Sequence, residues 1–494
     1  MPAGKRIGDD ADKQVAKKLA ISNDSQVCRF PSDIMQRVAF FIQDQATFFC
    51  FLEGYVESEA LGSLQLVWDL SKTLGRRNVW PELKLCELKT VDCAPVVLAV
   101  GPLYPTVHFI GMSDIDLMQQ FLTPSTRVAW HSSSKCTPPE PWGPWYKRLS
   151  MLNLVHVHED NCAAERLEMS LAYFPDFALL RALEISNCRV YSMDPIFEFV
   201  RHSKLTSLKL FSIQLQSEDG NDTNENQDEE DQGGWEENTL TTKHIQDLTF
   251  WIKHQPVKSF RWSGFTLAAK PTALKLFYDT LFACDTLRSF YHSDVPMLGF
   301  TSTTWSKPLQ IDQLTFEATD FNVDDMEALC QGLADSRVLT FELNTSEGSH
   351  EGFQALANAL PLTQLQEVGI FYSELDDEDC GYLAAALSNS KLAKLNLAGN
   401  SVTNVGAIVL AKHIKESPHL VRLDVSCNRI QYLGASALVQ AMGGHPRIPN
   451  TLLLLYQNKL DEADEKGLKS IADQFSATHR CYLKRDHYVE MELS

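Results

Sequence analysis

The sequence predicts an α/β solenoid in which short strands alternate with helices, preceded by a small helical module. Two segments, starting at Leu392 and Leu420, repeat one pattern 28 residues apart. Each begins with alternating apolar residues, which predict a short strand, and continues with apolar residues at helical spacing. The pattern extends on both sides of this pair with a period close to 27 residues, which indicates a repeat array.

The composition is that of a folded globular protein with an excess of acidic residues. The 494 residues include 44 lysines and arginines against 64 aspartates and glutamates, a net charge of −20. This charge disfavours a protein that binds the phosphates of nucleic acid. The 12 cysteines include no C-x-x-C pair, so neither a disulfide scaffold nor a thiolate zinc site is expected. The N-terminus has no apolar signal segment, which favours a cytoplasmic or nuclear protein.

The N-terminal part of the chain divides into a polar tail and a compact helical module. Residues 1–26 are polar and charged without a strong period, and we expect a flexible tail. Residues 27–85 are dense in apolar side chains. Their spacing predicts three short helices, which would begin near Ser32, Ala46 and Glu59.

The order of features in this module resembles an F-box. A hydrophobe–Pro pair, Phe30 and Pro31, precedes an Ile-Met-x-x-Val helix, and Trp80 ends a span of 51 residues. The resemblance implies a subunit of a cullin-type ubiquitin ligase that binds a Skp-type adaptor. The adaptor-facing residues that it implies are Phe30, Pro31, Ile34, Met35 and Val38. The alternative is a helical cap that covers the open edge of the first repeat, which every solenoid needs.

Residues 86–148 are rich in proline and aromatic residues, and we expect degenerate strands there that link the module to the array. The uncharged run 93–113 contains three prolines, each of which would interrupt a membrane-spanning helix. Short strands are therefore expected instead of a membrane segment, and the strands of this region would lie at 96–100, 107–110 and 127–130. Residues 138–146, PPEPWGPWY, favour an ordered loop over a polyproline recognition segment.

Residues 149–475 contain the repeats. Strand patterns start 27 residues apart at Ile311, Val338 and Leu365, and a further strand is expected at Asn450. All twelve helix positions at fixed offsets from six consecutive starts are apolar. Looser strand patterns lie upstream, at Leu149, Leu180, Leu205, Val257 and Leu287. About eleven repeats are therefore expected, followed by a C-terminal cap or tail at 476–494.

An acidic insertion interrupts the repeats at residues 216–238. It contains ten acidic residues and no basic ones, and removing its 23 residues leaves 29, the length of one ordinary repeat. A segment of this composition cannot bury enough apolar area to offset its ordering entropy, so we expect a disordered loop.

The repeated pattern L-x-x-L-x-L-x-x-N resembles the leucine-rich repeat family, and the period with a full helix per repeat is similar to its ribonuclease-inhibitor type. The asparagines of the two clearest copies are Asn400 and Asn428, and Cys188 stands at this place upstream. Each asparagine side chain is expected to bond backbone groups of the following turn. The resemblance implies an open horseshoe whose concave face binds another protein.

Alternation along each strand predicts which side chains face a partner. The leucines point into the core, so the residues between them lie on the concave face. This set includes Glu184, Lys209, Phe211, Arg261, Tyr291, Glu317, Glu342, Phe371, Lys394, Asn396, Arg422, Asp424 and Tyr456. Its four aromatic residues are of the type that anchors protein interfaces, although scattered surface aromatics are also common in proteins without a partner.

No catalytic site, metal site or cofactor is expected. The sequence lacks the H-E-x-x-H, P-loop, G-x-G-x-x-G and G-x-S-x-G motifs. One cluster carries side chains that could bind a metal, but it favours solvated surface at a strand end; it consists of His156, His158, Glu159 and Asp160.

We therefore expect a protein-interaction module, most simply the substrate-recognition subunit of a cullin-type ubiquitin ligase, with a Skp-type adaptor, a cullin and an unknown protein client as partners. Nucleic acid and membrane are not expected as partners. One alternative is a Ran-type GTPase-activating protein, in which an arginine after a strand stabilises the charge of the transition state. Arg189 and Arg429 occupy such positions. The other alternative is a non-catalytic scaffold.

Overall fold

The computed structural model describes residues 32–56, 61–86, 93–134, 136–216, 238–346, 348–445, 451–475 and 479–483. The expected tail, Phe30, Pro31 and almost all of the acidic insertion lie outside these ranges. The chain divides into two compact units: the first comprises residues 1–108 and 119–126, and the second comprises residues 109–118 and 127–494. No helix of the described part is both long and apolar enough to span a membrane.

Three helices dominate the first unit, as the apolar spacing predicted: α2 (Ser32–Phe41), α3 (Gln45–Glu53) and α4 (Leu64–Leu74). The Asp44 carboxylate caps α3 by accepting a hydrogen bond from the Thr47 N–H (2.7 Å). Trp80 closes the core of the module. Its ring stacks on Phe48, with centroids 3.7 Å apart, and its indole N–H donates to the Ile42 carbonyl (2.8 Å).

The remaining elements of this unit correct one prediction. The expected strand at 96–100 is a helix, α6 (Ala94–Val100), with Pro95 in its first turn. Proline is tolerated there because the first N–H groups of a helix have no partner within it. The short helix η3 (Gly101–Leu103) likewise has Pro102 at its start. The expected strand at 107–110 is confirmed as β2 (Thr106–Ile110), which lies beside β1 (Leu83–Cys86).

The second unit is a repeat array built around a parallel sheet. The strands of the main sheet follow one another in chain order, and four short strands form two separate pairs outside it. Within the array, the strands of the main sheet are β3 (Arg127–His131), β4 (Leu154–Asp160), β5 (Ala182–Ser186), β7 (Ser207–Phe211), β10 (Ser259–Ser263), β12 (Ser289–Ser293), β13 (Gln313–Glu317), β14 (Thr340–Asn344), β15 (Glu367–Phe371), β16 (Lys394–Asn396), β17 (Arg422–Asp424), β18 (Thr451–Leu454) and β19 (His479–Tyr482).

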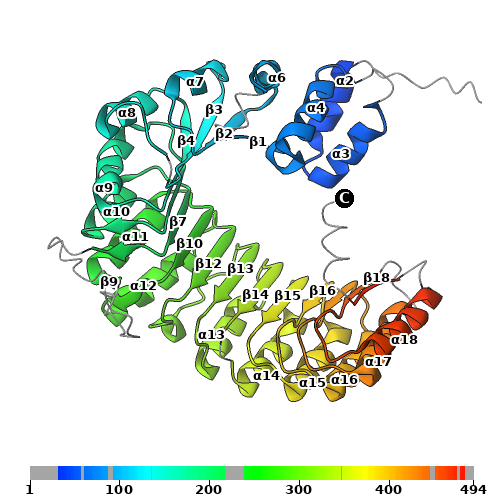
Figure 1. Ribbon diagram of the computed structural model, residues 1–494. Helices are drawn as coiled ribbons and strands as arrows, with labels where there is room; N and C mark the ends of the chain where they lie inside the picture. The colour runs from blue at the N-terminus through cyan, green and yellow to red at the C-terminus, as the bar shows by residue number, and fades with distance from the viewer. Residues whose placement is uncertain are drawn as a thin grey trace, which may run out of the picture. The chain divides into compact units, whose positions relative to one another are not determined.

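Helices connect most of these strands and cover the outer side of the sheet (Figure 1). They are α8 (Trp142–Leu149), α9 (Ala164–Tyr173), α10 (Asp194–His202), α11 (Thr242–His254), α12 (Pro271–Phe282), α13 (Val323–Leu333), α14 (His350–Ala359), α15 (Asp377–Ala386), α16 (Asn404–Ile414), α17 (Tyr432–Gly443) and α18 (Glu462–Ala472), while α7 (Ile115–Gln120) crosses the boundary between the units. Strand and helix thus alternate as the period predicted. The inward side chains of the strands form the core.

Two predictions near the start of the array were wrong. Leu149 does not start a strand, because it ends helix α8, and the strand of that repeat begins at Leu154. Residues 138–146 are not a loop throughout, since α8 begins at Trp142 and buries Trp145, whose indole N–H donates to the Ser113 carbonyl (2.6 Å). In the C-terminal segment, where a cap or tail is expected, strand β19 pairs with β18 at the edge of the sheet.

Asparagine side chains link consecutive repeats, whereas the pattern predicted that each would bond backbone groups of the turn that follows it. The Asn428 amide donates to the carbonyls of Leu397 in the preceding repeat (2.9 Å) and of Val425 in its own repeat (3.1 Å), and its oxygen accepts from the Val402 N–H (3.0 Å). These bonds satisfy buried backbone groups that would otherwise have no partner. At the equivalent place upstream the Cys188 thiol donates to the carbonyl of Ser186 (3.2 Å), so a thiol replaces the amide.

The two ends of the acidic insertion lie next to each other. The Leu215 N–H at the end of β8 (Gln214–Leu215) donates to the Asn238 side-chain oxygen (3.1 Å). Two short parallel pairs border this place, β8 with β6 (Arg189–Val190) and β9 (Thr239–Thr241) with β11 (Thr266–Ala268). Removing the residues between these ends would therefore leave the repeat spacing intact.

We accordingly expect deletion of residues 218–237 to leave the midpoint of thermal unfolding nearly unchanged. The measurement is a thermal melt of the full chain and of the deletion variant. A large fall in the midpoint would mean that the segment packs against the array, contrary to the prediction.

A buried histidine makes the stability of the array depend on pH. The Nδ1 atom of His292 accepts from the Trp262 indole N–H (2.8 Å), and its Nε2–H donates to the Val295 carbonyl (2.7 Å). Burial lowers the pKa of His292 to about 4. The unfolded chain thus takes up this proton near pH 6.5, whereas the folded chain does so only near pH 4.

The free energy of unfolding should therefore fall by about 3 kcal/mol as the pH drops from 6.5 to 4, and this contribution should be complete above pH 6.5. Urea denaturation across this pH range measures the slope. In a His292→Gln variant, which does not titrate at this position, the slope should be shallower by this amount. An unchanged slope would contradict the assignment.

Candidate protein-binding surfaces

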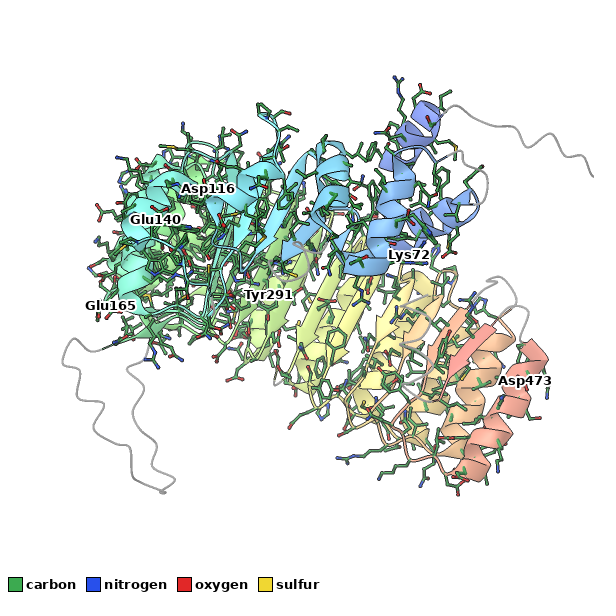
Figure 2. The ribbon with its side chains drawn as sticks, turned by 45° about the horizontal axis from the view of Figure 1, so that its top comes forward. Lys72, Asp116, Glu140, Glu165, Tyr291 and Asp473 are labelled. Carbon is green, nitrogen blue, oxygen red and sulfur yellow. The ribbon has the colours of Figure 1, made fainter. Side chains whose placement is uncertain are left out.

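The concave side of the second unit presents three rows of side chains, because consecutive strands pair in register. One row runs through Lys209, Arg261 and Tyr291, and it reaches Glu342 further along the sheet. A second row, two residues later on each strand, contains Phe211, Glu317 and Phe371. The third row, two residues earlier, contains Lys394 and Arg422. The predicted column of concave residues is therefore a surface three residues wide, with Tyr291 on it (Figure 2).

Most of the predicted concave residues are at least partly exposed, but Asp424 is not. Its side chain is buried, and its carboxylate accepts a hydrogen bond from the Ser426 N–H (2.9 Å). Asp424 therefore supports the turn after β17 and cannot contact a client directly. Asn396 on β16 and Asp424 on β17 pair in register, and the next residue in their row is Leu454 on β18. Tyr456 lies beyond the end of β18, so it does not continue this row.

A connected group of charged and aromatic side chains lies on strands β5 to β12. The Lys209 ammonium is paired with the Glu184 carboxylate and lies 4.8 Å from the centroid of the Phe211 ring. The rings of Phe211 and Tyr291 stack, with centroids 5.3 Å apart. The Arg261 guanidinium lies 5.9 Å from the Tyr291 ring. These contacts hold large side chains in place before a partner binds, which lowers the entropic cost of binding.

The pKa values of two groups in this region follow from their contacts. Burial raises the pKa of Tyr291 to about 12, and the hydrogen bond that its hydroxyl donates to Glu317 adds to the shift. Burial alone would raise the pKa of Glu184, but the hydrogen bond from the Lys209 ammonium outweighs this effect, so the pKa is lowered. At neutral pH the tyrosine is therefore protonated and the glutamate ionised.

Phe371, one of the predicted anchors, folds back over its own strand. A Cβ atom at Gly369 would lie 2.2 Å from the Phe371 ring, which means that the ring covers the glycine. The ring is partly exposed, whereas its neighbour Ile370 is fully buried. The predicted alternation of these two side chains is confirmed.

The histidine cluster at β4 is arranged differently from the prediction. His156 and His158 lie on one face as alternation requires, and the His131 ring joins them, with centroids 5.0 and 5.7 Å away. Glu159, on the opposite face, is fully buried, not solvated. Its carboxylate accepts from the Tyr146 hydroxyl (2.7 Å) and from the Arg166 guanidinium (2.9 Å). No sequence pattern connects His131, Tyr146 or Arg166 with this cluster, because they come from other elements.

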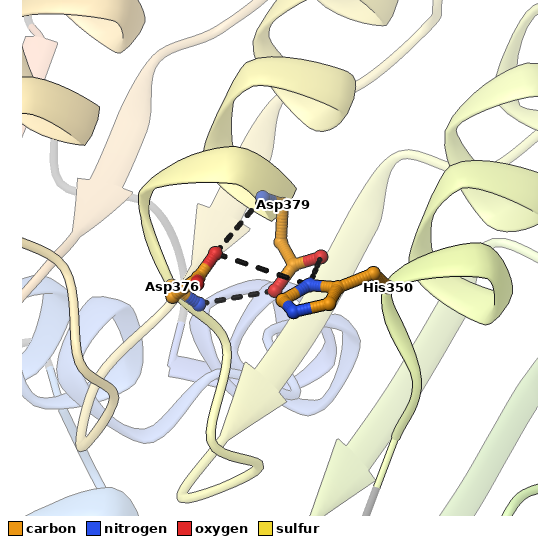
Figure 3. Close-up of side chains that lie close together, drawn as sticks. All are labelled: His350, Asp376 and Asp379. Atoms are coloured by element: carbon orange, nitrogen blue, oxygen red, sulfur yellow. Dashed lines mark hydrogen bonds and ion pairs between the residues drawn. The ribbon is translucent and has the colours of Figure 1, made fainter.

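A second cluster that could hold a metal, formed by His350, Asp376 and Asp379, joins two repeats (Figure 3). His350 donates to the Asp379 carboxylate (2.9 Å), which also accepts from the Asp376 N–H (3.1 Å). The Asp376 carboxylate in turn accepts from the N–H groups of Glu378 and Asp379 (2.8 and 3.4 Å). These bonds form a capping box for α15, and the hydrogen bond to Asp379 raises the pKa of His350. Helix capping accounts for Asp376 and Asp379, and the ion pair with Asp379 accounts for His350.

Helix α2 in the first unit exposes an unusual amount of apolar surface. Ile34, Val38 and Phe41 are 42%, 45% and 86% exposed. Their spacing of four and three residues places them on one face of the helix. Met35, by contrast, is 2% exposed and, with Ala39, holds the helix on the core. The implication that Met35 faces an adaptor is therefore wrong, while Ile34 and Val38 are accessible.

The two arginines of the GTPase-activator alternative are both exposed. Arg189 lies in β6, and Arg429 follows Asn428 in the turn after β17. Within the described ranges neither forms an ion pair.

Comparison with known proteins supports the repeat array. Residues 388–411 and 416–439 match the family model described as Leucine Rich repeat, so the two clearest copies of the pattern are leucine-rich repeats, as predicted. NACHT, LRR and PYD domains-containing protein 9C of Mus musculus is 24% identical over 230 residues, which cover 44% of this chain but 23% of that protein. An internalin from Listeria monocytogenes has a TM-score of 0.36 and 12% identity, with 69% of this chain and 83% of that chain covered.

Proposed function

We propose that this protein is the substrate-recognition subunit of a cullin-type ubiquitin ligase, in which the N-terminal helices dock a Skp-type adaptor and the leucine-rich repeat array binds the client. The protein itself would break or form no covalent bond. Its role would be to hold the client near the transferring enzyme.

The observation that carries the adaptor half of this proposal is the apolar stripe on α2. A helix that served as a cap alone would place its large apolar residues against the protein, because exposing them to water is unfavourable. Here Met35 and Ala39 perform that task, while Ile34, Val38 and Phe41 point to solvent. An exposed stripe of this kind is typical of a helix that docks into a partner.

The client half of the proposal rests on the preorganised concave surface. Lys209, Phe211, Arg261 and Tyr291 form consecutive contacts across three neighbouring strands. Arginine and tyrosine are enriched among the residues that dominate protein interfaces.

Substitution of the α2 stripe tests the adaptor half directly. In an Ile34→Ser, Val38→Ser, Phe41→Ser variant, co-purification with a co-expressed Skp-type adaptor should be lost, because the apolar contact area is gone. A matched control is Val405→Ser with Ile408→Ser, since these residues are 62% and 42% exposed on α16 of the array. The control should still bind the adaptor, and both variants should keep the thermal midpoint of the unmodified chain.

Two results would count against the proposal. Failure of the unmodified chain to bind any Skp-type adaptor would favour the scaffold alternative. If Arg189→Ala or Arg429→Ala instead removed stimulation of GTP hydrolysis by a small Ran-type GTPase, the activator alternative would be correct.

A further inference from the structure

A hollow of about 280 Å³ lies on the concave side between strands β4 and β10. Its base is formed by short side chains, because Ala182, Ser207 and Ser259 occupy consecutive positions in register on β5, β7 and β10. The neighbouring row supplies one wall, with the longer side chains of Glu184, Lys209 and Arg261. His156 lies at one end.

Two cations stand side by side in this wall. Lys209 and Arg261 are direct register partners on adjacent strands. Like charges in that arrangement destabilise a sheet. The charge of Lys209 is offset by Glu184. Arg261 forms no ion pair within the described residues and contacts the Tyr291 ring instead. A guanidinium that lies next to a second cation and has no carboxylate partner among the described residues points to a functional site.

From this hollow we infer that the client contributes an acidic side chain, aspartate or glutamate, which is bound by the guanidinium of Arg261. The two cations and the one carboxylate of the hollow leave a single positive charge, which one carboxylate neutralises. A guanidinium presents paired N–H groups that match a carboxylate in plane, and the hydroxyls of Ser207 and Ser259 add donors. Phe211 and Tyr291 offer an apolar surface beside it.

The same charges argue against the other anions. A phosphorylated side chain carries close to two negative charges. After the single positive charge of the hollow was neutralised, an excess of negative charge would remain beside Glu184. A nucleic acid would meet a protein whose net charge is −20. Burial lowers the pKa of His158, so this neighbour of Glu184 adds no positive charge at neutral pH.

The test uses the full chain and a displayed library of short random peptides. Selection on the immobilised protein should enrich aspartate or glutamate at one position. Changing that residue to its amide in a synthetic peptide should weaken binding about tenfold, the loss expected when a charge-assisted hydrogen bond is removed. Arg261→Gln should weaken binding of the acidic peptide equally and should leave binding of the amide peptide unchanged.

Lys275→Ala is the matched control, because Lys275 is a cation on the outer helix α12, away from the concave surface, that pairs with Asp279 (2.8 Å). It should leave both affinities unchanged. The inference is wrong if no acidic residue is enriched, if the acid-to-amide loss persists in Arg261→Gln, or if a phosphoserine peptide binds more tightly than the acidic one. The inference rests on the client half of the proposed function. Adaptor binding is measured separately, so a failure of the adaptor half can be distinguished from a failure of this inference.

Discussion

Replacing Glu159 by alanine should lower the free energy of unfolding by about 3–5 kcal/mol, the cost of leaving a buried charge without its partner. The Glu159 side chain is fully buried, and the Arg166 side chain is 11% exposed with its guanidinium 4.1 Å from the Trp142 ring. Burial raises the pKa of Glu159, while Arg166 and Tyr146 oppose the shift. Loss of the carboxylate would leave the guanidinium and the Tyr146 hydroxyl without an acceptor. Urea denaturation measures the effect.

The position of the pair in the protein makes this prediction specific. As a control, Asp69→Ala removes the partner of Lys72 in an ion pair whose side chains are 47% and 62% exposed, and it should cost under about 1 kcal/mol. Replacing Glu159 and Arg166 together by leucine and methionine should recover most of the loss. Equal effects of the buried and the exposed substitutions would show that Glu159 is in contact with water.

Ile370→Ala should destabilise the array by about 2–5 kcal/mol, while Phe371→Ala should cost about 1 kcal/mol or less. Ile370 is fully buried on the inner side of β15, so its truncation leaves a cavity. Phe371 covers Gly369 on the concave side and remains partly exposed. Chemical denaturation of both variants compares the two costs.

This pair of variants tests the register of the strands. Because side chains alternate, a shift of one residue exchanges the inner and outer sets. A large loss for Phe371→Ala together with a negligible loss for Ile370→Ala would invalidate the assignment of every concave residue.

The array was predictable from sequence because strand alternation and helix spacing recur together at one period. Leu392 and Leu420 define that period, and the register in the structure agrees with it. The first strand was misplaced at Leu149 because an isolated apolar pattern can fit either the end of a helix or a strand. The helix at Ala94–Val100 differs from the prediction because Pro95 lies in its first turn, where proline does not interrupt a helix.

The binding surfaces were predictable only in part. Alternation alone placed Lys209 and Arg261 on the concave side, but their pairing with Glu184 and Tyr291 depends on register and rotamers. Asp424 was misassigned because alternation gives the direction of a side chain and not its depth. On α2, helical spacing identified Ile34 and Val38, whereas the burial of Met35 depends on how the three helices pack.

In the proposed function, the α2 stripe docks the adaptor and the concave surface stays free for a client. Hydrogen–deuterium exchange of the full chain, with and without a purified Skp-type adaptor, tests this most directly. We expect slower amide exchange in residues 32–56 and 61–74 and unchanged exchange in strands β5 to β15. Protection of those strands, or protection nowhere in the chain, would contradict it.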